Sequence, residues 1–347
     1  LQPYNKTFLQ PFSYRYKTNP HADSTVVGDL LNSNNVIAYL DNGAKKTIVI
    51  GAHYDHLGRN EHNNSTKPFS KGIIHNGADD NASGTAALIE LAKILSKASK
   101  QGDAYNKNNY LIIHFSAEEL GLIGSKYWLD NPTIQTSFNY MVNMDMVGRY
   151  DATKKMSLGG YGTSSKWSEI ISKTPTTLLY TIDSAGTGPS DHASFYRKDM
   201  PVLFMFTGSH ADYHKATDDW DKINYEGQKD ILRFVQNIIQ TTNTYGKLDF
   251  LKTREAAMGR STKFTVSLGV MPDYAYTGTG LRIEGASAGK LGEKLGLKAG
   301  DILLQMGDYK FIDVTSYMTT LSKFKKGDST FLIYKRGTEE IKVDITF

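Results

Sequence analysis

Short, almost continuous apolar runs alternate along the first two thirds of the chain with longer segments in which apolar residues recur every three or four positions. The apolar runs predict buried β-strands at 36–40, 47–52, 110–115, 140–144, 178–182 and 202–205. The recurring pattern predicts amphipathic helices at 85–98, 122–128 and 226–245. Strands that alternate with helices in this way indicate an α/β domain with a mostly parallel mixed sheet flanked by helices.

Three segments between these elements have their own signals. Asp41-Asn42-Gly43, between the first two apolar runs, is typical of a tight turn and predicts that the two flanking strands form a hairpin. The aromatic- and proline-containing segment 1–16 predicts an irregular arm or an edge strand. The polar stretch 60–76 has no periodicity, so we expect a surface loop there.

The last quarter of the chain has a different residue pattern. Residues 255–347 combine many glycines with short apolar runs, and the whole chain of 347 residues is long for one domain. We therefore expect two domains, at residues 1–250 and 255–347.

Composition excludes several classes of protein. The net charge of +4 is spread evenly along the chain, which argues against a nucleic-acid partner. No run approaches the ~18 apolar residues of a membrane-spanning helix. Cysteine is absent, which excludes disulfides and thiolate metal sites and leaves His, Asp and Glu as the strong metal ligands. A cysteine-free chain that begins at Leu1 without a leader favours an exported protein, periplasmic or extracellular, whose signal peptide has been removed.

Charged residues gather where the predicted strands end. Asp79 and Asp80 lie at the N-terminus of the helix predicted at 85–98, where the backbone N–H groups favour negative charge. Seen alone, such residues are usually helix caps. However, His53 ends the run 47–52, and Glu118-Glu119 follow the run 110–115. In a parallel sheet these strand ends meet at one edge, so we expect the side chains to form one site.

The candidate ligands come from five separate segments: His53, Asp80, Glu119, Asp145 and His214. Imidazoles and carboxylates without thiolate suit Zn²⁺ in a hydrolytic site. Five ligands with a central carboxylate indicate two ions ~3.5–4 Å apart that share a bridging group. We expect Asp80 to be the bridge, because adjacent residues point apart and Asp79 would face elsewhere.

Two further carboxylates have expected roles. Consecutive glutamates also diverge, so Glu118 is predicted to be the general base while Glu119 faces the metals. Asp55 is placed to accept the ring N–H of His53 and fix its tautomer. The other histidines are expected to pack, face solvent or support the ligands: His56, His75, His114, His192 and His210. Ser190-Asp191-His192 is not a hydrolase triad, because three consecutive residues cannot form that relay.

Six motifs carry a family resemblance. In chain order they are GAHYDH, GADDNASG, SAEELGLIGS, NMDMVG, SDHASF and DYHKATDD. Together, from about residue 36 to 245, the chain resembles the dinuclear zinc aminopeptidase family of clan MH, typified by secreted bacterial leucyl-type aminopeptidases. The resemblance implies a zinc-exopeptidase fold and two Zn²⁺ ions. The implied zinc ligands are His53, Asp80, Glu119, Asp145 and His214. It also implies that Asp80 bridges and precedes a cis peptide to Asn81, that Glu118 is the general base, and that Tyr213 donates to the oxyanion.

The C-terminal segment carries a second resemblance. GLRIEG, GLKAGDIL and the helix predicted at 314–324 are similar to a PDZ domain of the bacterial protease-associated kind. This implies a carboxylate-binding loop that captures a peptide terminus by strand addition, formed by Ser267, Leu268, Gly269 and Val270. The alternative is a structural β-rich module without a ligand.

The sequence therefore predicts a zinc-dependent aminopeptidase that removes the N-terminal residue of peptides through a metal-bridging water activated by Glu118. Two relatives of the same fold are alternatives: glutaminyl cyclases, which keep one zinc, and carboxypeptidases. An inactive adaptor that binds peptides through the PDZ domain is a third. The complete ligand set together with Glu118 favours the aminopeptidase.

Overall fold

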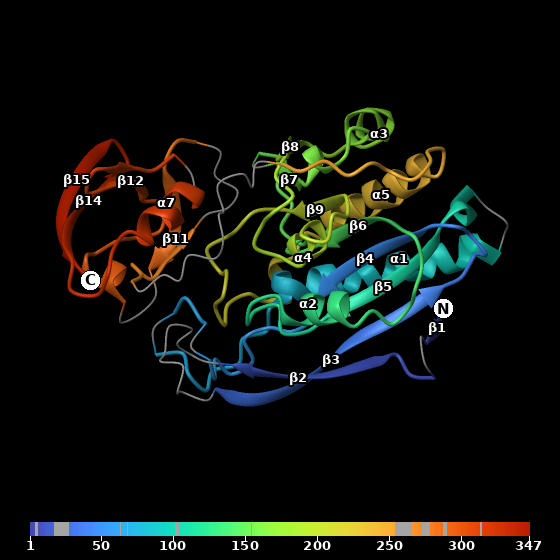
Figure 1. Cartoon of the computed structure of the whole chain (residues 1–347), viewed down its shortest axis with the longest axis horizontal. Helices are drawn as coiled ribbons and strands as arrows, with labels where there is room; N and C mark the ends of the chain where they lie inside the picture. Colours follow the sequence, from blue (N-terminus) through green and yellow to red (C-terminus); the bar gives the residue numbers. More distant parts are fainter. Residues whose placement is uncertain are drawn as a thin grey trace.

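The computed structural model describes residues 1–3, 6–16, 28–62, 64–67, 69–100, 104–153, 155–253, 266–272, 278–286, 290–312 and 314–347. These residues form two sheets, and each sheet packs on hydrophobic clusters of its own (Figure 1). The predicted boundary at residue 255 lies outside the described residues, so the division into domains 1–250 and 255–347 stays a prediction.

The larger sheet has nine strands in the order β1-β3-β5-β4-β6-β9-β7-β8, with β2 paired to β3. Their bounds are β1 (Gln2–Pro3), β2 (Leu9–Tyr16), β3 (Asp29–Leu40), β4 (Thr47–His53), β5 (Asn109–Phe115), β6 (Phe138–Met144), β7 (Met156–Gly159), β8 (Tyr180–Ile182) and β9 (Val202–Phe206). The apolar runs predicted as strands are confirmed, and the N-terminal segment supplies the edge strand β2.

The sheet is parallel only at its centre, where β5, β4, β6 and β9 run together, and in the β7–β8 pair. The other pairings are antiparallel. The sheet is therefore mixed, as predicted, but it is not mostly parallel. The central strand β4 is buried along its whole length, as parallel strands covered on both faces must be. Strand β2 alternates buried and more exposed residues, which suits an antiparallel edge with one covered face.

Helices cover both faces of this sheet (Figure 1). On one face lie α1 (Gly84–Lys100), α3 (Trp167–Lys173) and α5 (Tyr225–Thr242); on the other lie α2 (Ile123–Asp130) and α4 (His192–Tyr196). Neighbouring residues of β4 show the two layers, because Ile48 packs with Leu88 of α1 whereas Val49 packs with Trp128 of α2. The predicted helices and their apolar faces are confirmed.

The predicted hairpin between β3 and β4 is wrong, because β5 lies between these strands and pairs with both. The connecting segment wraps around the start of β5, where Oδ1 of Asn109 accepts the backbone N–H groups of Asn42 and Ala44 at 2.9 and 3.1 Å. A tight turn joins only neighbouring strands, ~4.8 Å apart. The segment Asp41 to Gly43 does turn, since the Gly43 N–H donates to Oδ1 of Asp41, but the strand that pairs with β3 is β5, far along the chain.

The smaller sheet has the order β10-β11-β12-β14-β15, with β13 paired to β12. Its elements are β10 (Val270–Pro272), β11 (Leu281–Ala286), α6 (Leu291–Lys294), β12 (Ile302–Met306), β13 (Tyr309–Lys310), α7 (Val314–Leu321), β14 (Ser329–Arg336) and β15 (Glu339–Thr346). Leu268, Leu303 and Leu332 lie fully buried in its core. The short strands and the helix near 314 were predicted, and β10 lies at one end of the strand order.

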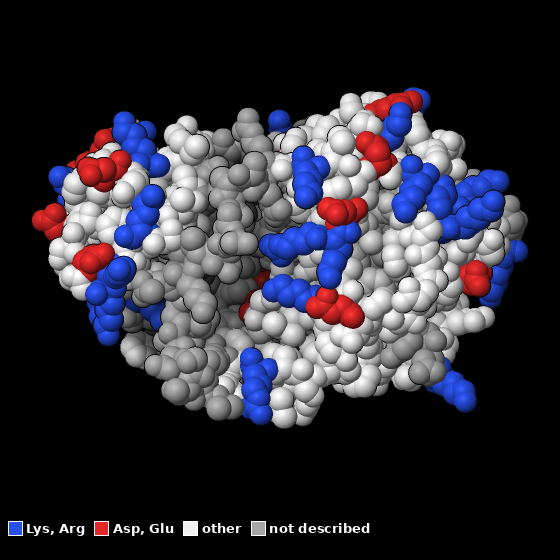
Figure 2. Space-filling view, viewed as in Figure 1, with Lys and Arg blue, Asp and Glu red and all other residues white. Residues whose placement is uncertain are grey.

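Within the described part of the chain, none of the helices combines the length and apolar character needed to cross a bilayer. Asp and Glu side chains lie among the Lys and Arg side chains on the face drawn in Figure 2. This mixture agrees with the small net charge of the sequence. The predicted absence of a nucleic-acid partner and the predicted export stay predictions.

Candidate active site

The candidate site lies at the carboxyl ends of the central parallel strands. His53 is the last residue of β4, Glu118-Glu119 follow β5, and Asp145 directly follows β6. His214 lies in the loop after β9. Because these strands are neighbours in one parallel set, their carboxyl ends bring segments distant in sequence to the same edge of the sheet.

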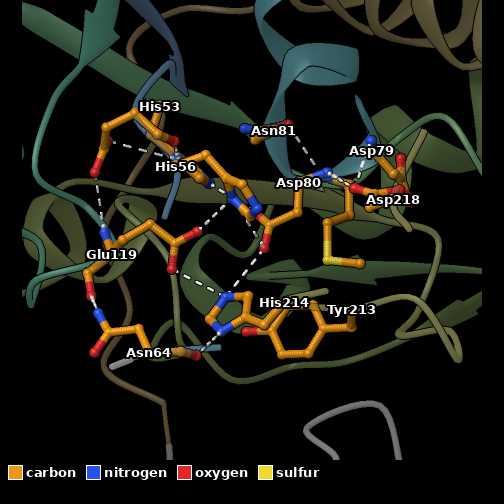
Figure 3. Close-up of polar contacts among 12 residues, drawn as sticks. His53, His56, Asn64, Asp79, Asp80, Asn81, Glu119, Tyr213, His214 and Asp218 are labelled. Atoms are coloured by element: carbon orange, nitrogen blue, oxygen red, sulfur yellow. Dashed lines mark hydrogen bonds and ion pairs between the residues drawn. The ribbon is translucent and has the colours of Figure 1, made fainter. Parts of the chain in front are cut away.

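Asp80 lies at the centre of this group, in the irregular turn η1 (Ala78–Ser83) that leads into α1 (Figure 3). Its Oδ1 lies 3.4 Å from Nε2 of His53, and its Oδ2 lies 3.2 Å from Nε2 of His214. Asp145 Oδ1 approaches the same nitrogen of His53 at 3.2 Å, and Glu119 Oε2 approaches that of His214 at 2.9 Å. The carboxylate of Asp80 is thus shared by two imidazole–carboxylate groups.

Two sets of side chains could hold a metal ion. Single ligand atoms of His53, Asp80 and Asp145 lie within 4.8 Å of one another, and so do those of His56, Asp80 and Glu119. Both sets contain Asp80, and both offer only imidazole nitrogen and carboxylate oxygen. This donor chemistry fits Zn²⁺.

The electrostatics of the site favour positive charge at two points. Burial lowers the pKa of His53 and of His214, but the carboxylates beside them outweigh it and raise both pKa values well above the ordinary one. Burial raises the pKa of Asp80, but hydrogen bonds from His214 and His53 hold it well below its ordinary value. Two cations bound among these carboxylates would supply the same positive charge.

Glu118 and Glu119 face different parts of the site. Glu119 contacts His214 and His56, whereas the charged groups that act on Glu118 include His53 and Asp145. Burial raises the pKa of Glu118 well above its ordinary value; His53 opposes the shift, and Asp145 adds to it. A carboxyl group in this setting accepts and holds a proton readily.

Asp55 occupies the expected place but makes different contacts. The nearest acceptor for Nδ1 of His53 is the backbone carbonyl oxygen of Asp55, at 3.1 Å, while the carboxylate lies at 3.7 Å. The carboxylate accepts the backbone N–H groups of Glu118 and Glu119, at 3.1 and 3.3 Å. Asp55 therefore orients both glutamates as well as the ring of His53, which sequence reasoning did not foresee.

A buried network fixes the turn that carries Asp80. Oδ2 of Asp218 accepts the backbone N–H groups of both Asp79 and Asp80. The side chain of Asp79 points away from Asp80, accepting the Gly148 N–H at 2.6 Å and facing Nε2 of His210 at 3.2 Å. Asp218 lies in the motif DYHKATDD, but nothing in the residue pattern separates it from the neighbouring acids of that segment.

Asn81 joins the turn to α1. The peptide between Asp80 and Asn81 is cis, as the resemblance implied. Oδ1 of Asn81 accepts the N–H of Gly84, the first residue of α1, and its Nδ2 donates to the carbonyl of Met144, which precedes Asp145. One amide thus caps the helix and ties it to β6.

Tyr213 and His214 lie on the loop after β9. Their rings stack, with centroids 4.0 Å apart, and Nδ1 of His214 donates to the carbonyl of Asn64 at 3.1 Å. The oxyanion role of Tyr213 is not tested by these contacts and stays a prediction.

The other histidines differ in their surroundings. His75 bonds to the Ile73 carbonyl and to Ser65, and His192 stacks on Phe204, where burial lowers its pKa to about 3. His56 takes one of the expected places, that of a residue that supports the ligands, because its Nδ1 lies 2.9 Å from Oε1 of Glu119. Its position three residues after His53 was the available signal.

A pocket of about 230 Å³ opens beside the site, between the start of β3 and the segment after β4. Its wall includes Asp55, His56 and Glu119 on one side and Tyr14 and Asn32 on the other. The pocket therefore lies between Glu119 and the N-terminal strands β2 and β3.

Known proteins match the part of the chain that carries these residues. The model of peptidase family M28 matches residues 35–239. A probable leucine aminopeptidase of Arthroderma otae is 32% identical over 182 residues, covering 49% of this chain and 45% of the relative. Leucine aminopeptidase 1 of Coccidioides posadasii is 30% identical over 209 residues, covering 55% of this chain and 51% of the relative. The chain spans about half the length of the curated relatives it matches.

Solved structures share the fold. A glutaminyl cyclase from Porphyromonas gingivalis matches with a TM-score of 0.53 at 18% identity, covering 68% of this chain and 83% of the other. A leucine aminopeptidase precursor from Bacteroides thetaiotaomicron matches with a TM-score of 0.51 at 21% identity, covering 67% and 83%. At these identities the likeness establishes the fold and does not separate the two activities.

Proposed function

Because this chain belongs to peptidase family M28, we propose that it is a zinc-dependent aminopeptidase that hydrolyses the N-terminal residue of peptides. The main observation behind the proposal is that the two oxygens of the Asp80 carboxylate face different imidazoles, those of His53 and His214. A carboxylate with one oxygen toward each of two ligand groups suits a bridge between two ions.

The proposed ligands fall into two sets, and in the second set we assign His214 rather than His56, because Nε2 of His214 lies 3.2 Å from Oδ2 of Asp80 whereas Nδ1 of His56 lies 4.0 Å from it. His53, Asp80 and Asp145 would hold one Zn²⁺, and Asp80, Glu119 and His214 would hold the other. When bound, zinc polarises a carbonyl oxygen and lowers the pKa of a coordinated water to ~7.

The protein's own part in the reaction centres on Glu118. Its carboxylate takes the proton of the attacking water and delivers it to the nitrogen of the leaving amine. The raised pKa of Glu118 supports this role, because a carboxylate with a raised pKa takes up a proton more readily. Asp55 holds the backbone of Glu118 in place, and we propose Tyr213 as a donor to the developing oxyanion.

We include in the proposal a preference for apolar N-terminal residues, and two members of one apolar cluster are chain neighbours of ligands. Met146, Phe204 and Phe206 are buried together, and Tyr213 packs against them. Met146 directly follows Asp145, and Tyr213 precedes His214. The names of the relatives, which are leucine aminopeptidases, point the same way.

A substrate panel tests the proposal. Purified protein is incubated with aminoacyl chromogenic amides, their N-acetylated forms and peptides with N-terminal Gln, with zinc measured in the same samples. We expect cleavage of free-amine substrates only, fastest for leucyl and other apolar residues. Cyclisation of the Gln peptides without amide cleavage would instead establish the glutaminyl cyclase alternative, and loss of C-terminal residues would establish a carboxypeptidase.

We also propose that the C-terminal unit is a PDZ domain. Leu268 is buried, its carbonyl accepts the Gly292 N–H at 2.6 Å, and Gly269 has φ +69°, a conformation that favours glycine. Among the described strands, β10 ends the strand order, which supports addition of a peptide strand beside the loop Ser267 to Val270.

Two experiments test this unit. Calorimetric titration of the full chain should detect peptides with a free C-terminal carboxylate and not their amides. Binding of neither peptide would favour a structural module, and equal binding of both would remove the carboxylate-binding assignment of the loop. Truncation after Thr253, which keeps its N–H bond to the Tyr196 hydroxyl, should leave a folded domain that still binds zinc.

A further inference from the structure

His56 contacts the proposed ligand set from outside it. Its Nδ1 lies 2.9 Å from Oε1 of Glu119, whereas Oε2 of Glu119 lies 2.9 Å from Nε2 of His214. The two oxygens of one carboxylate therefore face two different imidazoles. Since an ionised carboxylate can only accept, His56 donates from Nδ1.

The ring of His56 is held in this position by its surroundings. Its side chain is nine-tenths buried. A Cβ at Gly77 would lie 2.5 Å from Cγ of His56, so only a glycine lets the ring lie against this backbone, three residues before Asp80. On another side the ring meets that of His214 edge to face, with centroids 5.9 Å apart.

His56 and His214 are not equivalent toward the shared carboxylate. Nε2 of His214 lies 3.2 Å from Oδ2 of Asp80 and 2.9 Å from Oε2 of Glu119, so three atoms that can bind a metal ion lie close together. Nδ1 of His56 is 4.0 Å from the same oxygen of Asp80 and 2.9 Å from Oε1 of Glu119.

We propose that His56 is a positioning residue for the second metal ion: it binds Oε1 of Glu119 and thereby presents Oε2 as a single-oxygen ligand beside His214. This inference rests on the proposed two-zinc function. A hydrogen-bonded partner of a ligating carboxylate fixes its orientation, and loss of such a partner typically weakens metal binding ~10–100-fold. Because His56 contacts only one of the two ligand sets through Glu119, its loss should affect one ion more than the other.

The test measures zinc affinity of the full chain, not activity. Metal-free protein is titrated with Zn²⁺ against a chromogenic chelator at neutral pH. His56→Leu fills the space without a donor. His56→Asn puts an N–H at the position of Nδ1, because its amide nitrogen is the same number of bonds from Cβ. His114→Leu removes a partly buried histidine on β5 and is the control.

We expect two bound ions in the wild type and in His114→Leu. In His56→Leu one ion should bind ~10–100-fold more weakly while the other is unchanged. In His56→Asn both affinities should lie within about threefold of the wild type. If the Leu variant does not fold, as judged by circular dichroism, His56→Ala replaces it with the same expectation.

Three results would overturn the inference. Unchanged affinities in His56→Leu would show that Glu119 needs no partner. Equal loss of both ions would show that His56 supports the site as a whole. An Asn variant as weak as the Leu variant would make His56 itself a ligand. Failure of the wild type to bind two ions is a separate result, since it removes the proposed function and is seen before any variant is compared.

Discussion

Oδ2 of Asp218 accepts the backbone N–H of Asp80 at 3.0 Å and connects the loop that carries His214 to the residue at the centre of the site. The same oxygen accepts the N–H of Asp79 at 2.9 Å, and Oδ1 of Asp218 lies 2.9 Å from Arg149. Asp218 is fully buried, so these bonds are made away from water. The position of Asp80 thus depends on a residue 138 positions later in the chain.

The first prediction concerns this connection. Asp218→Ala leaves two buried N–H groups without an acceptor, at about 1–3 kcal/mol each, and releases the turn that holds Asp80. Because Asp80 belongs to both proposed metal sets, zinc titration should show that both ions bind more weakly, by ~10–100-fold. Asp221→Ala, a nearby exposed residue, should change neither affinity nor stability. Wild-type affinity in a folded Asp218→Ala protein would contradict this role.

The second prediction tests the bridge itself. Asp80→Ala should weaken both ions, whereas His53→Ala should mainly weaken one, because Asp80 contributes an oxygen to each group and His53 contributes to one. Loss of a supporting partner alone costs ~10–100-fold, so loss of the ligand should exceed ~100-fold. Equilibrium dialysis measures the stoichiometry. Two zincs held tightly by the Asp80 variant would remove the bridging assignment.

The third prediction separates the two glutamates. Glu118→Gln removes the base and keeps the shape, so kcat should fall at least ~100-fold while zinc content and KM stay near wild type. Glu119→Gln should lower zinc occupancy, with activity partly restored by added zinc, because an amide is a poorer ligand. Metal analysis and steady-state kinetics on both variants decide the matter, and the opposite pattern would exchange the two roles.

The fourth prediction concerns acid stability. Burial lowers the pKa of His114 from 6.5 to about 4. Above pH ~6.5 the residue is neutral in both states and has no effect. As pH falls from 6.5 to 4, the imidazole binds a proton in the unfolded chain but not in the folded protein. The free energy of unfolding therefore decreases, by about 3 kcal/mol in all.

His114→Leu should lack this loss, so the difference in stability between the two proteins should change by about 3 kcal/mol between pH 7 and pH 4. Urea unfolding of metal-free protein, followed by tryptophan fluorescence, measures it. The three tryptophans, Trp128, Trp167 and Trp220, all precede the C-terminal unit, so the signal reports on the domain that contains His114. A pH-independent difference would show that His114 titrates normally.

The sequence by itself determined the local elements and most of the candidate ligands. Helix α5 and strand β4 follow from the spacing of apolar residues, because periodicity is a property of neighbouring positions. His53, Glu119 and Asp145 were identified because each follows an apolar strand, and parallel strands end at a common edge. The divergence of Asp79 from Asp80 followed from the geometry of adjacent residues.

Only the tertiary structure decided which distant groups meet. The turn after β3 has hairpin chemistry, yet β5 enters between β3 and β4, because strand pairing is decided by packing across the whole sheet. His56 and His75 are both loop histidines in sequence, but only His56 lies against Glu119. Asp218 is one of several acids in its segment and acts on Asp80 only because the fold buries it beside that turn. A side chain's role depends on its partners in space, and sequence patterns report only on partners that are near in the chain.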